Sequence, residues 1–427
     1  MDASKPQPSK PQPSKPQPSK PQSSKPQSSS PQSCLTHGAL KGIKVLDLSR
    51  ILAGPTCTQM LGDLGAIVVK VENPKTGGDD TRQWGPPYVV DEAGKRSDLS
   101  AYFMAANRNK RSIALDIASP EGQAVIRRLA AEADILVENF KPGGLAKYGL
   151  DYASLRAEFP GLIYCSISGY GQTGPNSSKP GYDLMAQGYG GLMSLTGEPQ
   201  GQPVKAGVGI ADVMCGMYAT IGVLAALHHK TLTGEGQQID LALVDAQVAW
   251  LINEGVAYLN TGELPQRRGN EHPSIVPYGL YETSDAHVIL AVGNDSQFRR
   301  FMEFLGLEGL AEDPRFATNP ARLQHRGALN DILQPALKRF TMDAVIAGME
   351  ARKVPAGPVQ TLDRVFASDQ VAARDMAIEM QSTAGPVQLL GNPLNFSRTP
   401  VTYRHAPPQC GAATEEILLA EDPFAET

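Results

Sequence analysis

The chain has 427 residues, 41% of them hydrophobic and 19% charged, so it can bury a large core and is expected to form a globular protein of two domains. Its formal net charge of -5 offers no basic surface for nucleic acid. No apolar run reaches the roughly 18 residues of a membrane helix, so we expect no membrane association. Five widely spaced cysteines without a CxxC pair argue against a disulfide framework and fit a reducing compartment.

The first 37 residues differ in kind from the rest of the chain. SKPQP recurs with a period of five between Ser4 and Pro18. Proline at every second or third position is incompatible with an amphipathic helix, so we expect neither a secretory signal nor an organelle presequence. Residues 1–37 are therefore predicted to be a disordered tail.

From Gly42 the pattern becomes a regular alternation of strands and helices. The segment GIKVLDLS predicts a strand, RILAGPTCTQMLGDLG a loop and a helix, and AIVVKVE a second strand. A helix near 120–132, the strand DILVENF, a helix near 143–157 and the strand LIYCSIS follow. This alternation predicts an α/β fold with a Rossmann-like parallel sheet, whose ligands bind beyond the carboxyl ends of the strands. The loops expected there are 50–55, 72 onward, 139–143 and 169–183.

After about residue 205 the pattern changes. GVGIADVMCGMYATIGVLAALHHK predicts a long, apolar core or interface helix, and residues 250–340 a second α/β unit with the strand HVILAVG. A β-rich segment then runs to Tyr403. Neither GxGxxG after the first strand nor GxxxxGK[ST] is present, so the usual dinucleotide and nucleoside-triphosphate fingerprints are missing.

The histidines argue against two common enzyme classes. No histidine lies between His37 and His228, and the adjacent His228 and His229 point about 100° apart on a helix. A serine hydrolase needs a histidine base and a zinc protease needs paired histidines. We therefore expect neither class, and no metal site.

Asp183 is the candidate catalytic residue. It is the single carboxylate between residues 166 and 197. Glycines on both sides would let backbone approach a ligand closely and could direct amides at an oxyanion; they are Gly169, Gly171, Gly174, Gly188, Gly190 and Gly191. The sequence PGYDLMAQ also fits a helix with Asp183 as its N-cap. On residue type alone, both interpretations stay open.

Taken together, several ordered motifs resemble the class III CoA-transferases of the formyl-CoA transferase type, from about residue 40 to the C-terminus. They are GIKVLDLSRILAGPTCTQMLGDLGAIVVKVE, FMAANRNKRSIALDIASPEG, DILVENFKPGGLAKYGLDY, YCSISGYGQTGP, PGYDLMAQGYGGLMSLTG and GVLAALHHKTLTGEGQQIDLALVDA. Within the family, HPSIVPYGLYETSDAHVILAVGNDSQF looks most like the succinyl-CoA:glutarate branch.

This resemblance implies an architecture. Two ring-like chains would interlock as a homodimer, each with a large Rossmann-like CoA-binding domain built from both chain ends and a smaller α/β domain. It places the first part of the large domain at 38–225, a linker helix and the small domain at 226–344, and the return to the large domain at 345–427.

The resemblance also implies a reaction. CoA would move from an acyl-CoA donor such as succinyl-CoA to a dicarboxylic acid such as glutarate. Asp183 would carry the reaction through a mixed anhydride and an aspartyl-CoA thioester, which divides one exchange into easier steps. The CoA thioester is then a substrate, and no permanently bound cofactor or metal is implied.

The resemblance assigns binding positions as well. Lys141 and Lys147 would suit the CoA phosphates. The CoA-binding positions are Leu52, Ala53, Leu115, Asp116, Ile117, Ala118, Asn139, Phe140, Lys141, Lys147, Gly169, Tyr170 and Gly171. Candidates for the acyl site are Arg82, Trp84, Tyr102 and Arg108, with Arg82 expected to hold a distal carboxylate as a bidentate fork.

Two departures from the formyl-CoA branch bear on the substrate. Leu52 replaces a glutamine, and the run of glycines expected near 269–279 is missing. Both favour a larger dicarboxylate than oxalate, with glutarate, itaconate, mesaconate, citramalate and malate all open.

Three alternatives also stay open: a 2-methylacyl-CoA racemase, for which no upstream histidine is available, an acyl-CoA hydrolase, and a non-catalytic CoA-binding protein. The expected location is the cytoplasm, or the mitochondrial matrix in a eukaryote.

Overall fold

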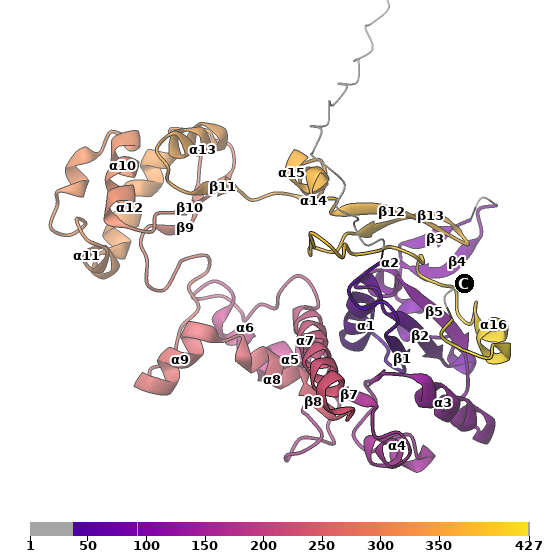
Figure 1. Cartoon of the computed structure of the whole chain (residues 1–427). Coiled ribbons are helices and arrows are strands. Elements are labelled where there is room, and N and C mark those ends of the chain that lie inside the picture. The colour runs from indigo at the N-terminus through magenta and orange to yellow at the C-terminus, as the bar shows by residue number, and fades with distance from the viewer. Residues whose placement is uncertain (1–36, 92, 426–427) are drawn as a thin grey trace, which may run out of the picture. The chain divides into compact units, whose positions relative to one another are not determined.

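The computed structural model describes residues 37–91 and 93–425 (Figure 1). All but the last residue of the predicted 1–37 tail lie outside the described residues.

A six-stranded sheet is the centre of the first and larger folded region. Its strands lie in the order β5-β2-β1-β6-β7-β8, and each pairs with its neighbours in parallel. Their bounds are β1 (Lys44–Asp47), β2 (Ile67–Glu72), β5 (Lys110–Ala114), β6 (Ile135–Glu138), β7 (Ile163–Ser168) and β8 (Gln238–Ala242). The parallel α/β sheet predicted from the sequence is confirmed.

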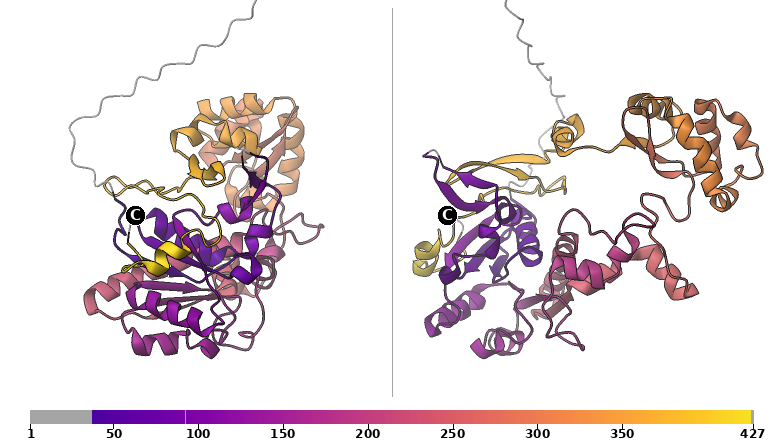
Figure 2. Two further views of the ribbon diagram at one scale, coloured as in Figure 1. Left: turned by 90° about the vertical axis from the view of Figure 1, so that its right-hand side faces the viewer. Right: turned by 180° about the vertical axis from the view of Figure 1, so that it is seen from behind.

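Successive residues of the strands point into two separate cores. Val45 packs on one face of the sheet and Leu46 on the other, as the period of two in a strand requires. The first face is covered by α1 (Ala53–Asp63) and α7 (Ile210–Thr233). The second is covered by α3 (Pro120–Glu132), α4 (Tyr152–Glu158) and α16 (Thr414–Leu419) (Figures 1 and 2). Because both faces are buried, the central strands are rich in apolar residues, although Asp47, Lys70 and Lys110 are buried charged residues of the same sheet.

The strand order reverses beside β1. The chain builds outward from β1 through β2 to β5 and then crosses back, so that β6 lies on the other side of β1. Loops that follow β1 and β6 therefore diverge at the carboxyl edge, which is where open α/β sheets bind ligands.

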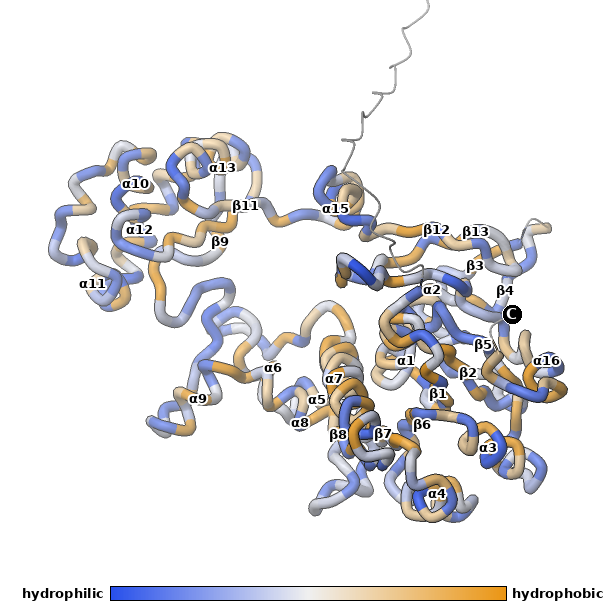
Figure 3. Tube along the Cα trace, viewed as in Figure 1, coloured by the Kyte–Doolittle hydropathy of each residue, from blue (hydrophilic) through white to orange (hydrophobic). Residues whose placement is uncertain are grey.

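Helix α7 is apolar along most of its length, with polar residues at its C-terminal end (Figure 3). Ala211, Cys215 and Ala219 pack into the core, whereas Met217 and Ile221 are exposed. Our expectation that no segment is apolar enough to cross a membrane was wrong: within the described residues α7 alone meets that criterion by length and composition. Half of its apolar stretch is buried in the fold, as in a core helix.

A second core is built on an antiparallel sheet in the order β11-β10-β9. Its elements are β9 (Tyr278–Glu282), β10 (His287–Ala291), α10 (Asp295–Leu305), α11 (Asn319–Gln324), α12 (Arg326–Leu337), α13 (Met342–Ala351) and β11 (Ala356–Pro358). The boundaries differ from those we predicted: position 225 falls inside α7, β8 belongs to the large sheet, and position 345 falls inside α13, which packs in this second core.

The C-terminal segment returns to the large sheet. Ala413, Ile417 and Phe424 are buried in the same core as Leu46, and the Ala413 amide donates to the Ser112 carbonyl at 2.9 Å. The chain also forms two antiparallel hairpins. The first, β3 (Tyr88–Val90) with β4 (Arg96–Ser100), lies between β2 and β5 in the sequence, and the second, β12 (Ala377–Ser382) with β13 (Gly385–Leu390), follows β11.

The remaining helices are short. They are α2 (Ala101–Met104), α5 (Asp183–Tyr189), α6 (Leu192–Leu195), α8 (Leu243–Ala249), α9 (Ile252–Thr261), α14 (Leu362–Phe366) and α15 (Asp369–Ala373). Four 3-10 turns complete the described elements, at Pro74–Thr76, Asp80–Gln83, Ala146–Tyr148 and Glu308–Ala311.

Candidate active site

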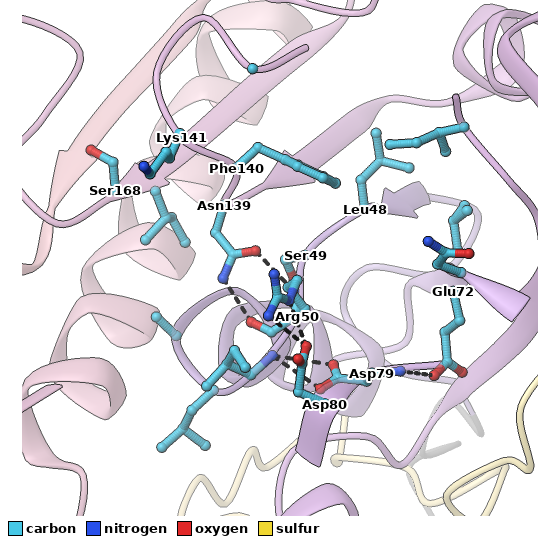
Figure 4. Close-up of a pocket in the computed structure, with 18 of the residues that line it drawn as sticks. Leu48, Ser49, Arg50, Glu72, Asp79, Asp80, Asn139, Phe140, Lys141 and Ser168 are labelled. Atoms are coloured by element: carbon cyan, nitrogen blue, oxygen red, sulfur yellow. Dashed lines mark hydrogen bonds and ion pairs between the residues drawn. The ribbon is translucent and has the colours of Figure 1, made fainter. Parts of the chain in front are cut away.

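A cavity of about 650 Å³ opens at the carboxyl edge of the large sheet (Figure 4). Its walls come from segments that follow successive strands: 48–53 after β1, 115–118 after β5, 139–142 after β6 and 167–169 at the end of β7. The cavity therefore lies where the strand pattern predicted a ligand.

The positions assigned to CoA by resemblance gather on this cavity. Tyr170 and Gly171 are the two that do not line it: the Tyr170 ring packs edge-on against Tyr189, with centroids 5.2 Å apart, and the Gly171 amide donates to Ser168 Oγ at 2.9 Å. The lining positions are Leu52, Ala53, Leu115, Asp116, Ile117, Ala118, Asn139, Phe140, Lys141, Lys147 and Gly169.

The loop after β1 is held by side chains from two other loops. Asn139 Oδ1 accepts from the Arg50 amide at 2.9 Å, and Asn139 Nδ2 donates to the Arg50 carbonyl at 2.7 Å (Figure 4). The Ile51 amide donates to both Asp79 oxygens at 3.2 Å. Ile51 has a φ of 71°, a conformation that strains a β-branched residue. Asn139 thus braces the loop with the amide that we had expected to face CoA.

Two buried ion pairs lie beneath this loop. Lys70 Nζ is 3.1 Å from Asp79 Oδ2 and also donates to the Ser49 carbonyl at 2.8 Å. Lys110 Nζ is 3.1 Å from Asp47 Oδ2. Burial lowers the pKa of Lys110 to about 8 despite the nearby charge of Asp47. Burial also acts against the charged form of Lys70, but Asp79 and Asp47 outweigh it and raise the pKa of Lys70. Of the two ion pairs, Lys70 and Asp79 line the cavity.

Basic side chains stand at the cavity's exposed rim. Lys141, Lys147 and Lys179 line it and are exposed, and Arg50 pairs with Asp80 at 2.6 Å. Lys147 Nζ lies 4.6 Å from the centroid of the Tyr148 ring. Exposed lysines of this kind suit the phosphates of a nucleotide-like ligand.

Asp183 is the first residue of α5 and does not cap that helix. Tyr182 is the N-cap, with no side-chain hydrogen bond. Asp183 Oδ1 instead accepts from the Ala211 amide in the first turn of α7, at 2.8 Å, and Oδ2 accepts from Gln187 Nε2 at 2.6 Å. The carboxylate therefore lies at the positive end of another helix and is not among the lining residues of the cavity.

Asp212, which sequence reasoning missed, lines the cavity directly. It is 8% exposed, and its carboxylate accepts no hydrogen bond within the described part of the chain. Burial and, secondarily, the charge of Asp183 raise its pKa to about 7. The sequence held one signal: Asp212 is the single acidic residue of α7 and lies in its mainly apolar first part.

Two predicted acyl-site residues lie near these carboxylates. Burial raises the pKa of Tyr102, and the charges of Asp212 and Asp183 raise it further. Trp84 packs edge-on against Tyr102, with ring centroids 5.1 Å apart. Leu52 approaches from the loop after β1: a Cβ placed on Gly209 would lie 3.0 Å from Leu52 Cδ2 and 3.7 Å from Asp183 Cγ, so Gly209 lies close to both side chains.

Arg82 and Arg108 do not fit the predicted role. Arg82 is fully buried, pairs with both oxygens of Glu72 at 2.7 and 2.6 Å, and donates to Asp98 at 2.7 Å. Arg108 pairs with both oxygens of Asp63 at 2.8 and 2.5 Å. Both guanidinium groups are used inside the fold, so neither is offered to a substrate carboxylate.

Comparisons with known proteins agree with this site. The model of CoA-transferase family III matches residues 40–414. A relative from Agrobacterium fabrum named succinate--glutarate CoA-transferase is 48% identical over 91% of this chain and 97% of its own. The human succinyl-CoA:glutarate CoA-transferase is 40% identical over 89% of this chain and 85% of its own.

Solved structures agree as well. A CaiB/BaiF family protein from Brucella suis has a TM-score of 0.80 and 46% identity, and the match covers 90% of this chain and 99% of that one. The chain therefore belongs to CoA-transferase family III and is a CoA-transferase acting between an acyl-CoA and a carboxylic acid.

Proposed function

We propose that this enzyme moves CoA from succinyl-CoA to glutarate or a dicarboxylate of similar length, with Asp212 as the covalent nucleophile. One observation carries the proposal: a buried carboxylate without a hydrogen bond lines a cavity whose rim carries exposed lysines. The names of the Agrobacterium fabrum and human relatives support the acid pair.

The geometry favours Asp212 over Asp183, to which the sequence reasoning gave this role. Asp183 has both oxygens engaged by Ala211 and Gln187 and does not line the cavity. Asp212 lines the cavity with both oxygens unengaged in the described residues. A raised pKa also makes the ionised carboxylate a stronger nucleophile than an ordinary aspartate.

The proposed steps account for every acyl group and for the CoA thiolate, and no water is consumed. An Asp212 oxygen attacks the succinyl-CoA carbonyl and CoA thiolate leaves, which forms a succinyl-aspartyl anhydride. The thiolate attacks the aspartyl carbonyl of that anhydride and succinate leaves, which forms an aspartyl-CoA thioester. Glutarate attacks this thioester and releases the thiolate again, and the thiolate then attacks the glutaryl carbonyl of the second anhydride. The products are glutaryl-CoA and the free Asp212 carboxylate.

We propose that the working form is a homodimer. Apolar side chains are exposed on the face of α7 away from the sheet, including Tyr218 and Ile221. Helix α9 has no buried residue, and Ile252, Val256 and Leu259 on it are at least 60% exposed. Apolar helix faces of this extent are typical of subunit interfaces.

The test is mass-spectrometric detection of new acyl-CoA after the protein is given succinyl-CoA with glutarate or other acids. Wild type should form glutaryl-CoA, and Asp212→Asn should form none. Free CoA without a new thioester would mean hydrolysis, and solvent deuterium entering the α-carbon of a 2-methylacyl-CoA would mean racemisation. Binding of CoA without any turnover would leave a non-catalytic protein.

A further inference from the structure

A dicarboxylic acid needs a positive charge for the carboxylate that does not react. The arginines first expected in that role, Arg82 and Arg108, each pair with a buried carboxylate of the fold. Other described cations around the site are engaged as well: Lys70 with Asp79, Lys110 with Asp47, Arg50 with Asp80, Arg268 with Glu254, and Arg267 with the carbonyls of Glu198 and Gly201. The far end of the acid therefore needs a different cation.

The segment between α6 and α7 runs alongside Asp183. The Ala206 amide donates to Gln187 Oε1 at 2.8 Å, and Gln187 Nε2 donates to Asp183 Oδ2 at 2.6 Å. Three residues further on, a Cβ placed on Gly209 would lie 3.7 Å from Asp183 Cγ. Lys205, directly before Ala206, is thereby anchored next to the two aspartates of the site.

The side chain of Lys205 is exposed and has no acidic partner among the described residues. Its Nζ donates to the Ala206 carbonyl at 2.9 Å. On either side of it in sequence, Val204 and Val208 are 48% and 65% exposed, and a Cβ on Gly207 would meet nothing within 4 Å. A cation beside open space and exposed apolar side chains suits a ligand with a carboxylate at the end of a methylene chain.

We propose that Lys205 determines the acid specificity of the enzyme: its ammonium binds the distal carboxylate of glutarate while the other carboxylate reacts beside Asp183 and Asp212. This inference rests on the proposed transfer to a dicarboxylate and does not depend on which aspartate is acylated. A dianionic acid that approaches two aspartates is repelled, and a nearby cation offsets that repulsion. The flexible stem of a lysine also lets the ammonium follow dicarboxylates of slightly different length.

The experiment measures kcat/KM for acceptors of equal chain length, which are glutarate, pentanoate and 5-aminopentanoate, with succinyl-CoA as the donor. The acceptor meets an enzyme that has already released the donor acid, so kcat/KM for the acceptor is independent of the donor. Lys205→Met should lower the value for glutarate about tenfold or more and leave that for pentanoate unchanged, because only glutarate loses a charged contact. Lys205→Arg should keep the preference of wild type for glutarate.

Lys205→Glu reverses the charge and should prefer 5-aminopentanoate to glutarate, because its carboxylate attracts the terminal ammonium and repels a carboxylate. Lys41→Met is the matched control: this exposed lysine precedes β1, at the edge of the sheet opposite the cavity, and its loss should alter none of the three values. An unchanged ratio of glutarate to pentanoate in Lys205→Met, or an equal loss for all three acids, would overturn the specificity role. Failure of wild type to form glutaryl-CoA would instead overturn the proposed function.

Discussion

Asp212 is held in the fold at a cost in stability. Its ordinary pKa of 3.8 is raised to about 7, first by burial and then by Asp183. Between pH 4 and 7 the folded protein therefore binds more protons at this site than the unfolded chain, and the stability falls as the pH rises through that window. Above about pH 7 the full cost is present, because Asp212 is then ionised in both states.

The first prediction follows from that cost. Asp212→Asn should lower kcat on the order of a thousandfold or more, because a covalent nucleophile is lost. It should also raise the melting temperature above that of wild type at pH 8, with a difference that shrinks toward pH 4. Kinetics and thermal melts at both pH values check this. A variant that is inactive and less stable at pH 8 would mean that Asp212 is a structural residue.

Arg82 is also a buried charged residue, but we expect its removal to lower the stability of the fold. Its removal leaves Glu72 buried without its partner and costs about 3–5 kcal/mol, which is typical of breaking a buried ion pair. Arg82→Met should therefore lower the urea midpoint strongly. Arg96→Met, at an exposed arginine over Tyr88, is the control and should change it little. Unaltered stability with altered acid selectivity would restore the substrate role first expected of Arg82.

At the scale of elements, the cavity depends on a loop held under strain. Residues 49–52 follow β1 and are fixed by Asn139 and Asp79 from two other loops. Ile51 stays at positive φ because these partners outweigh the strain. The pocket wall is thus assembled from segments nearly ninety residues apart in the chain.

Asn139→Ala tests this assembly. The substitution removes both hydrogen bonds to Arg50 and frees the loop to leave its strained conformation. The dissociation constant of CoA should rise about tenfold, since lost bonds and loop ordering together amount to roughly 1–2 kcal/mol. Calorimetric titration with CoA measures it. Asn330→Ala, at a hydrogen-bonded asparagine of the second core, should leave the affinity unchanged, and equal affinities in all three proteins would contradict the bracing role.

The elements also show what the sequence could and could not reveal. Continuous apolar runs predicted β1, β2, β6 and β7, and the position of their loops predicted the cavity, because a parallel sheet dictates both. The apolar composition of α7 correctly predicted a core helix, and for that reason Asp212 within it was not recognised as a residue of the cavity. Arg82 and Arg108 looked free because their partners Glu72 and Asp63 lie far enough away in sequence that no local pattern links them. Which charged side chains pair with each other depends on the tertiary fold and cannot be seen in a local stretch of sequence.

At the scale of the whole molecule, the exposed apolar faces of α7 and α9 are the surfaces on which we expect the second subunit of the proposed homodimer to pack. Stable interfaces bury about 1,200–2,000 Å² and have apolar centres. We therefore expect light scattering to give twice the mass of the 45.6 kDa chain. Ile221→Asp combined with Leu259→Asp, both at exposed positions, should shift the protein toward monomers. Leu419→Asp, at an exposed leucine near the end of α16, is the control and should remain dimeric. A wild-type monomer would contradict the proposal.

Because the C-terminal segment returns to the large sheet, the two cores can be completed only at different stages of translation. Ile417 and Phe424 complete the core around Leu46, so the sheet lacks part of this core until these two residues have been synthesised. The second core uses only residues between Val276 and Ala356 and can close while synthesis continues. The nascent sheet would meanwhile leave an apolar face uncovered, and exposed apolar surface of this kind promotes aggregation until residues 413–424 pack onto it.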